Sequence, residues 1–349
     1  MVHRYIQAAS KEVARSRVLE FTIRAMTIVA FVAVIFSPCV VVAQTRGSRE
    51  IKVPYTLGGS TGYFWVAYRS GAFERRGLKI QPIYIRSGFA ALQSLLAREV
   101  EIELQGGSAA TTAWAKGAKD LVYVAACGNR LDYILIAHSS IHKAQDLKGK
   151  IIAISQIGAS ADFIARYALR QLGLNAEKDV TYIGLGGSAE RWAALTGNRV
   201  AASVFQPPLA LLARKAGYPV LLDISKQDFQ YIIAGILTTR SFIRAEPDTI
   251  MNFLRALADG MEFYRDEKNR DAVTRFLGEF YRLSTPEELE ETRKVYSQFT
   301  SGPPVVTAKA IENVISNDRA LSTMNLRGAD MLDLSFLQRL EEERRVKTR

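Results

Sequence analysis

Short apolar segments alternate with amphipathic ones along most of the chain. Residues 51–57 (IKVPYTL) have the composition of a strand, and a glycine-rich turn follows them. Residues 63–76 then have the spacing of a helix that ends at Gly77. The same order of strand, turn and helix recurs up to a strand at residues 220–224. Strands that alternate with helices form mostly parallel sheets covered by helices, so the pattern predicts an α/β fold.

The alternation comes in two runs. A strand-like apolar segment at residues 131–137 separates the runs, and another at residues 231–238 follows the second run. After residue 244 the pattern changes to amphipathic helices, beginning at residues 247–264. Two runs of strand–turn–helix units, connected by two apolar segments, predict a protein with two lobes.

The N-terminus differs in composition from the rest of the chain. Basic residues dominate residues 1–24, an apolar run follows at 25–36, and Val41-Val42-Ala43 precedes a polar stretch. This order is typical of a signal peptide, and we expect cleavage after Ala43. The alternative is a retained membrane anchor, because residues 25–43 are long enough to span a bilayer. Pro38 and the small residue before the polar stretch favour cleavage.

Composition excludes several classes of protein. The 349 residues are 48% hydrophobic and 23% charged, which is the balance of a folded globular protein. The formal net charge is +11, but Lys and Arg are spread along the chain, so we expect no nucleic-acid partner. Two cysteines and three histidines predict neither a disulfide framework nor a metal site. Cys127 is expected to be a buried apolar residue.

Glycine combined with serine or threonine recurs where a strand passes into a helix. The turns are GGSTG at 58–62, RSG at 86–88, GGS at 106–108, GAS at 158–160 and GGS at 186–188. Each of these turns, considered alone, is explained by the usual preference of glycine and serine for turns and helix N-termini. Together they expose backbone N–H groups at the strand ends where α/β proteins bind ligands, which favours a polar or anionic ligand. None has a nucleotide-binding motif, and we expect no cofactor.

Four stretches resemble the solute-binding proteins of ABC transporters of the nitrate/taurine/sulfonate, or SsuA-like, family. They are residues 55–80 (YTLGGSTGYFWVAYRSGAFERRGLKI), 88–126, 146–175 and 187–221, in that order and spacing. The resemblance covers about residues 50–300. It implies a bilobal type II periplasmic-binding fold, with two mostly parallel sheets, flanking helices and a hinge of two segments near residues 131–138 and 231–239.

The resemblance also implies an organisation and a role. The signal peptide would occupy residues 1–43, the first part of lobe 1 residues 44–135, and lobe 2 residues 136–235. Residues 236–349 would complete lobe 1 and add the C-terminal helices. A periplasmic monomer would then capture a small polar solute, expected to be anionic, between closing lobes and pass it to a permease in the inner membrane.

The candidate ligand-binding residues lie at the polar turns and beside them. Their expected role is hydrogen bonding through hydroxyl, amide and backbone N–H groups. Of the aromatic residues Tyr63, Phe64 and Trp65, at least one is expected in the core and one is a candidate for the pocket wall. The candidates are Gly59, Ser60, Thr61, Tyr63, Phe64, Ser87, Gly107 and Ser108 in lobe 1, and Ser160, Ser188 and Gln206 in lobe 2.

Two other functions stay open at this point. An enzyme on the same fold, either pyrimidine-forming or a dehydratase of small aromatic acids, needs an acid or base in the cleft, for which Asp132 and Asp162 are the candidates. The chain lacks the cysteine cluster of the pyrimidine-forming branch, so we expect no catalysis. A membrane-tethered ligand sensor would instead keep the N-terminal segment.

Overall fold

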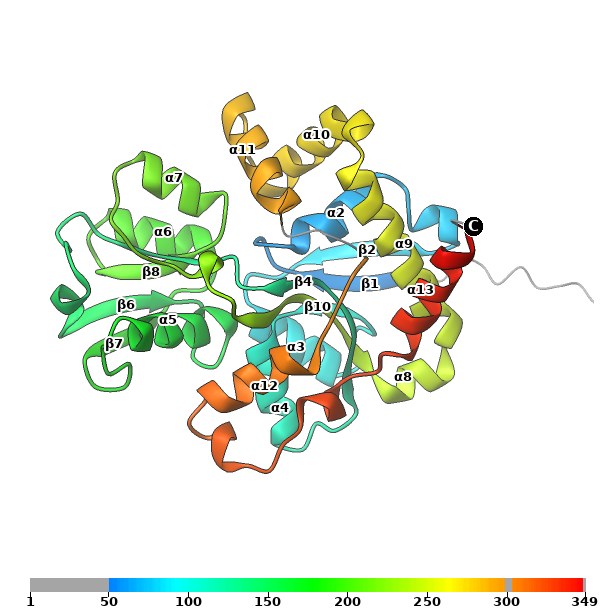
Figure 1. Ribbon diagram of the computed structural model, residues 1–349, viewed down its shortest axis with the longest axis horizontal. Helices are drawn as coiled ribbons and strands as arrows, with labels where there is room; N and C mark the ends of the chain where they lie inside the picture. Colours follow the sequence, from blue (N-terminus) through cyan, green and yellow to red (C-terminus); the bar gives the residue numbers. More distant parts are fainter. Residues whose placement is uncertain (1–49, 299–302, 348–349) are drawn as a thin grey trace, which may run out of the picture. The chain divides into compact units, whose positions relative to one another are not determined.

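The computed structural model describes residues 50–298 and 303–347 of the chain. The predicted signal peptide at residues 1–43 lies outside the described residues. Strands alternate with helices up to residue 239, and a series of helices follows (Figure 1). The predicted α/β class and its order of elements are confirmed.

The described strands form three sheets, where we expected two. β1 (Glu50–Tyr55) and β2 (Lys79–Tyr84) make a parallel pair. The second sheet has the strand order β3 (Glu103–Gln105), β10 (Gln230–Thr239), β4 (Leu121–Arg130), and its pairs are antiparallel.

The third sheet is built from residues 134–223, which we call the middle segment. Its strand order is β7 (Val180–Gly184), β6 (Lys150–Ile154), β8 (Ala202–Phe205), β5 (Ile134–Ala137), β9 (Val220–Asp223). β6 is parallel to β7 and β8, whereas β5 is antiparallel to β8 and β9. Helix α5 (Ser160–Gln171) lies on one face of this sheet, and α6 (Ser188–Thr196) and α7 (Leu209–Lys215) lie on the other (Figure 1).

The prediction of mostly parallel sheets is therefore only partly right. The antiparallel pairs involve β5 and β10. β5 is the first strand after the chain passes from the second sheet into the middle segment, and β10 is the first strand after the chain passes back. These strands enter their sheets from the opposite end to the strands of the strand–turn–helix units.

The two passages locate the connections between the sheets. Residues 131–133 join β4 to β5, within the predicted hinge region 131–138. Residues 224–229 join β9 to β10. We expected the second connection at residues 231–239, but those residues belong to β10, which pairs with both β3 and β4. The predicted lobe boundary after residue 235 thus falls inside β10, and the division into lobes stays a prediction.

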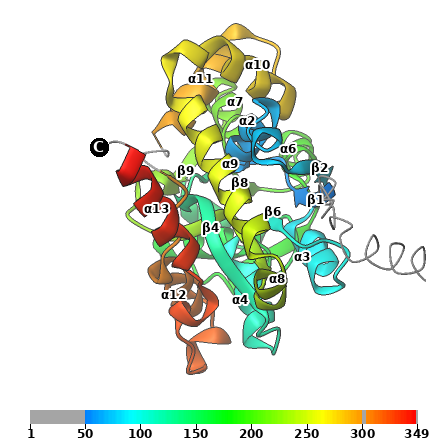
Figure 2. The same ribbon diagram turned by 90° about the vertical axis from the view of Figure 1, so that its right-hand side faces the viewer.

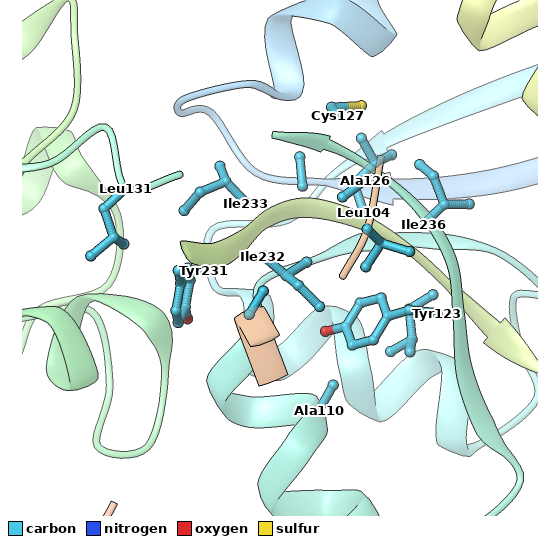
Figure 3. Close-up of a cluster of buried hydrophobic side chains, with 14 of the residues drawn as sticks. Leu104, Ala110, Tyr123, Ala126, Cys127, Leu131, Tyr231, Ile232, Ile233 and Ile236 are labelled. Carbon is cyan, nitrogen blue, oxygen red and sulfur yellow. The ribbon is translucent and has the colours of Figure 1, made fainter. Parts of the chain in front are cut away.

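The second sheet lies within the main hydrophobic core. Leu104, Tyr123 and Ile236 from its three strands are buried side by side (Figure 3). Cys127 of β4 is buried as expected, and burial raises the pKa of its thiol to about 12. The thiol is therefore protonated at neutral pH and packs as a small apolar group.

Helix α2 (Thr61–Arg69) is shorter than the predicted helix at residues 63–76. Gly71 takes a φ of 74°, in the left-handed region, and this ends the helical run. A separate 3₁₀ turn at Glu74–Arg76 precedes Gly77, whose φ is also 74°.

Helices of the C-terminal third pack back onto the start of the chain. They are α8 (Arg240–Ala245), α9 (Pro247–Arg265), α10 (Arg270–Tyr281), α11 (Pro286–Ser297), α12 (Ala308–Asn317) and α13 (Ser335–Lys347). α9 runs beside α2 and α13 (Figure 2). A Cβ atom on Gly260 of α9 would lie 2.2 Å from the Cβ of Ala67 in α2, so this approach requires glycine. Within residues 50–298 and 303–347, no helix has the length and apolar character needed to cross a bilayer.

Candidate ligand-binding cleft

A cavity of about 730 Å³ lies where the strand-to-helix turns converge. One wall is formed by the turns that lead into α2, α3 (Gly88–Leu96) and α4 (Gly107–Ala115). The N-termini of α5, α6 and α7 form the opposite wall, and residues of α10 and α11 close one end. The polar turns of the two runs therefore meet in one cleft, which is the usual place for a ligand in an α/β fold.

Five of the predicted ligand-binding residues line this cavity. They are Thr61, Ser87, Ser160, Ser188 and Gln206. Ser87 caps α3, because its Oγ accepts a hydrogen bond from the N–H of Phe89. The same hydroxyl donates at 3.1 Å to Oε1 of Gln156, which lies between β6 and α5.

The other six predicted residues do not line the cavity. They are Gly59, Ser60, Tyr63, Phe64, Gly107 and Ser108. In two of the turns the preceding glycine lines it instead, Gly58 before Gly59 and Gly106 before Gly107. Ser60 is turned away, towards β4, where a Cβ on Gly128 would meet its Oγ at 2.3 Å.

Both aromatic candidates belong to the core. Phe64 packs against Phe73 and Phe253, with ring centroids 5.6 and 6.4 Å away. Tyr63 packs edge-on to Tyr264, and its hydroxyl donates to the backbone carbonyl of Tyr296. The first turn of α2 thus faces the helices of the C-terminal third, and none of Tyr63, Phe64 and Trp65 is among the residues that line the cavity.

Ser108 and Ser160 are joined through a residue that the sequence did not suggest. The hydroxyl of Tyr231, at the start of β10, donates to Ser160 Oγ at 2.8 Å and lies 3.1 Å from Ser108 Oγ. It also accepts the backbone N–H of Ser108 at 3.1 Å. The Tyr231 ring lies at the end of the second sheet nearest the middle segment (Figure 3). This hydroxyl therefore ties the N-terminus of α4 to the N-terminus of α5.

Arg191 of α6 brings a buried positive charge to the cavity wall. Its side chain is 3% exposed, and its guanidinium donates to Ser188 Oγ at 2.9 Å, Ser203 Oγ at 3.2 Å and the Val204 carbonyl at 2.5 Å. Among the described residues no carboxylate lies within 4 Å of it, and its buried Nε has no hydrogen-bond partner. Burial lowers the pKa of Arg191, although nearby Tyr133 and Glu190 act in the opposite direction.

Other charges near the cavity are paired with carboxylates of neighbouring elements. Arg86, after β2, lies 3.9 Å from Glu190 of α6. Lys215 at the end of α7 lies 3.0 Å from both Glu287 and Glu291 of α11. These pairs are partly exposed, so each contributes little on its own. They nevertheless leave the Arg191 charge without a direct counter-ion.

The two carboxylates considered as acid or base candidates have different surroundings. Asp162 is not a lining residue. It forms an ion pair with Arg166 at 2.7 Å and accepts the N–H of Gly158 at 2.9 Å. Asp132 is buried on the connection between β4 and β5, and its Oδ1 accepts from Nε2 of Gln206 at 2.6 Å. Within the described part of the chain, no group of three His, Cys, Asp or Glu residues is placed to hold a metal ion.

The pattern of apolar residues around Arg191 could have identified it from the sequence as a candidate site residue. Arg191, Ala194 and Leu195 have the spacing of a single helix face, and these three are the buried residues of α6. An arginine on the apolar face of a helix that starts at a polar turn is a candidate for a buried functional charge. Tyr231 had no comparable signal, because its partners come from distant parts of the chain.

Comparison with known proteins agrees with this geometry. The model of the NMT1-like family matches residues 56–278. A Bacillus subtilis (strain 168) protein whose name refers to the binding of aliphatic sulfonates is 25% identical over 278 residues, which are 79% of this chain and 74% of the relative.

Two solved structures have the same fold. One is a protein from Bordetella bronchiseptica RB50, with a TM-score of 0.74 and 18% identity over 84% of this chain and 98% of that one. The other is the alkanesulfonate-binding protein SsuA from Xanthomonas axonopodis pv. citri bound to MOPS, with a TM-score of 0.67 and 20% identity over 82% and 98% of the two chains.

These likenesses show that the chain has the fold of periplasmic binding proteins, and they confirm the predicted resemblance to the SsuA-like proteins. The family model covers more than half of the chain, so this protein belongs to the NMT1-like family.

Proposed function

We propose that this protein is the solute-binding component of an ABC importer and that its ligand is an organic anion. In this proposal residues 1–43 direct export and are removed, and the mature protein works in the periplasm as a monomer. The two lobes close on the ligand, which is then passed to a permease in the inner membrane. The protein performs no chemistry on the ligand and binds no nucleic acid.

The observation that carries the proposal is the unneutralised charge of Arg191. A buried guanidinium without a carboxylate partner is costly, and an anion in the adjoining cavity lowers that cost. The backbone N–H groups of the first turn of α6 point towards the same place, because Ser188 lines the cavity as the first residue of that helix. Charge and helix N-terminus together favour a carboxylate or sulfonate at this end of the cavity.

The size of the cavity selects an anion with an organic body. Its 730 Å³ hold roughly 24 water molecules at about 30 Å³ each. A nitrate or sulfate ion fills only a small part of that volume. Apolar side chains such as Leu104, Leu209 and Ile233 line the cavity next to the polar turns. They suit a ligand with an apolar portion attached to its anionic group.

Five of the predicted residues keep a proposed role in binding: Thr61, Ser87, Ser160, Ser188 and Gln206. Thr61 and Ser87 belong to one wall of the cavity, and the other three residues belong to the middle segment. A ligand that bonds to both walls stabilises the arrangement in which the walls are close, so binding shifts the population towards closure.

Thermal unfolding with a panel of anions tests this function. The panel contains alkanesulfonates, benzenesulfonate, benzoate, nitrate and sulfate. A ligand at a hundred times its Kd adds about 2.7 kcal/mol to the free energy of unfolding. We expect organic anions to raise the melting temperature and nitrate to have no effect.

Variants then test the role of Arg191. Arg191→Gln should abolish the ligand-induced shift, whereas Arg214→Gln, on the exposed surface of α7, should keep it. Binding of the same anions by Arg191→Gln with unchanged affinity contradicts the role of Arg191, and the absence of a shift with every anion of the panel contradicts the anion assignment. Chemical conversion of the bound ligand contradicts the assignment as a binding protein.

A further inference from the structure

Asp132 is a carboxylate shut off from solvent beside the ligand cavity. It lies on the connection between β4 and β5, and its side chain is 1% exposed. Oδ1 accepts the bond from Gln206, while Oδ2 has no hydrogen-bond partner among the described residues. A carboxylate offers about four acceptor sites, so one bond leaves its charge largely uncompensated.

The groups that face Asp132 do not supply a counter-charge. The titratable side chains that interact with it are Tyr133, the next residue, Tyr281 of α10 and Tyr296 of α11. Phenols are neutral at physiological pH. Burial raises the pKa of Asp132 to about 7, against the lowering effects of the Gln206 bond and of the backbone N–H of Asp132 itself. Both protonation states are therefore populated near neutral pH.

Gln206 connects this carboxyl to the cavity. Its amide is held between Asp132 and the turn before α2, where a Cβ on Gly58 would lie 2.5 Å from Oε1 and a Cβ on Gly59 would lie 2.0 Å from Nε2. Gly58 lines the cavity and Gly59 does not. The amide oxygen therefore lies beside Gly58, a residue of the cavity wall, and the amide nitrogen lies beside Asp132.

The protonation of Asp132 determines which way this amide faces. An ionised carboxylate only accepts hydrogen bonds, so it holds the NH₂ group of Gln206 and leaves the carbonyl oxygen facing the cavity. A protonated carboxyl donates through its O–H, and the amide carbonyl then becomes its partner. The amide turns over within the same space, and its NH₂ group faces the cavity as a donor.

We propose that Asp132 is a positioning residue that, by turning the Gln206 amide, makes capture of an anionic solute depend on uptake of a proton. The donor orientation attracts an anion and the acceptor orientation repels it. The anion therefore binds the protonated form more tightly, and its affinity falls as the pH rises. This inference rests on the proposed function as a binder of organic anions.

Titration calorimetry with benzenesulfonate tests the proposal, because the charge of that probe is constant between pH 5.5 and 8.5. Protein purified after expression of the full chain should bind it roughly tenfold more weakly at pH 8.5 than at pH 5.5, the worth of one charge-assisted hydrogen bond. Measurements at pH 7 in two buffers of different ionisation enthalpy should show net proton uptake on binding.

Three variants separate the possible causes. Asp132→Asn imitates the protonated carboxyl and should bind tightly with no pH dependence. Gln206→Leu should bind weakly and also lose the pH dependence. Asp162→Asn, which alters a buried carboxylate paired with Arg166, should keep the wild-type pH profile. Circular dichroism confirms that each variant is folded, and the Gln206 variant serves if Asp132→Asn does not fold.

The outcomes distinguish the two proposals. Binding of benzenesulfonate with the same Kd at both pH values, or a pH dependence that persists in Gln206→Leu, overturns the proton coupling and leaves the anion-binding function intact. No binding of benzenesulfonate or of any anion of the panel, even at pH 5.5, overturns both.

Discussion

Replacing Glu103 by glutamine should remove a large part of the pH dependence of stability. Glu103 of β3 is fully buried, and its Oε1 accepts from Nε2 of Gln105 at 3.1 Å. Its Oε2 has no hydrogen-bond partner within the described residues. Burial raises the pKa of Glu103 from 4.5 to about 8, against the smaller lowering effect of the Gln105 bond.

The sign and size of the effect follow from this pKa. Between pH 4.5 and 8 the native state keeps a proton that the unfolded chain has lost, so stability falls as the pH rises. Each pH unit costs 1.36 kcal/mol, and the difference of 3.5 between the two pKa values gives about 5 kcal/mol at pH 9. Below pH 4.5 the penalty vanishes. Glutamine keeps the acceptor for Gln105 and carries no charge at any pH.

Urea unfolding followed by circular dichroism from pH 5 to pH 9 measures this difference. The free energy of unfolding of Glu103→Gln should exceed that of the wild type by an amount that grows up to pH 8 and then stays constant. Glu99→Gln, at an exposed position before the same strand, serves as the control and should run parallel to the wild type. If Glu103→Gln also runs parallel to the wild type, Glu103 ionises freely in the folded protein and the reasoning is refuted.

Three other substitutions have expected outcomes. Gly260→Ala should lower the free energy of unfolding by about 1–3 kcal/mol in thermal unfolding, because the added methyl group overlaps Ala67. An unchanged melting temperature would mean that α2 and α9 can move apart without cost. Lys215→Gln breaks the two ion pairs to α11 and should weaken ligand binding at most about fivefold, with no difference from wild type in 0.5 M salt. Tyr231→Phe should lower stability by about 1–3 kcal/mol, since it leaves the N–H of Ser108 unpaired; a loss confined to ligand affinity would contradict this.

The polar turns were predictable because their signals are local. Glycine and serine at the end of a strand indicate where a helix begins. The resemblance to binding proteins implied that those turns lie around one cleft. The same reasoning misplaced Gly107 and Ser108 by a residue or two. Successive side chains on a helix point about 100° apart, so a small error in where α4 begins moves a side chain from the cavity to the core.

Features that depend on contacts between distant segments were not predictable. β10 is a sheet strand because it pairs with β3 and β4, which lie about a hundred residues earlier. The composition of residues 231–238 predicted a strand-like segment, but it did not indicate the partners of that strand, and the resemblance implied a hinge there. The burial of Asp132 likewise depends on Tyr281 and Tyr296, whose helices return to this place from the C-terminal third.

The continuity of the middle segment has a consequence for how the chain folds. Pairing Gln230 of β10 with Arg130 of β4 closes a loop of 100 residues when nothing else has formed. Once Ile134 has paired with Asp223 in the five-stranded sheet, only three residues on one side and six on the other separate the paired positions. Loop-closure entropy then falls by about 2 kcal/mol. The middle segment can itself form in smaller steps, because β6 pairs with β7 at a sequence separation of 30, as in Ile151 with Thr181. Chain entropy therefore favours an order of events in which the middle segment folds first and the sheet of β3, β10 and β4 is completed around its two ends.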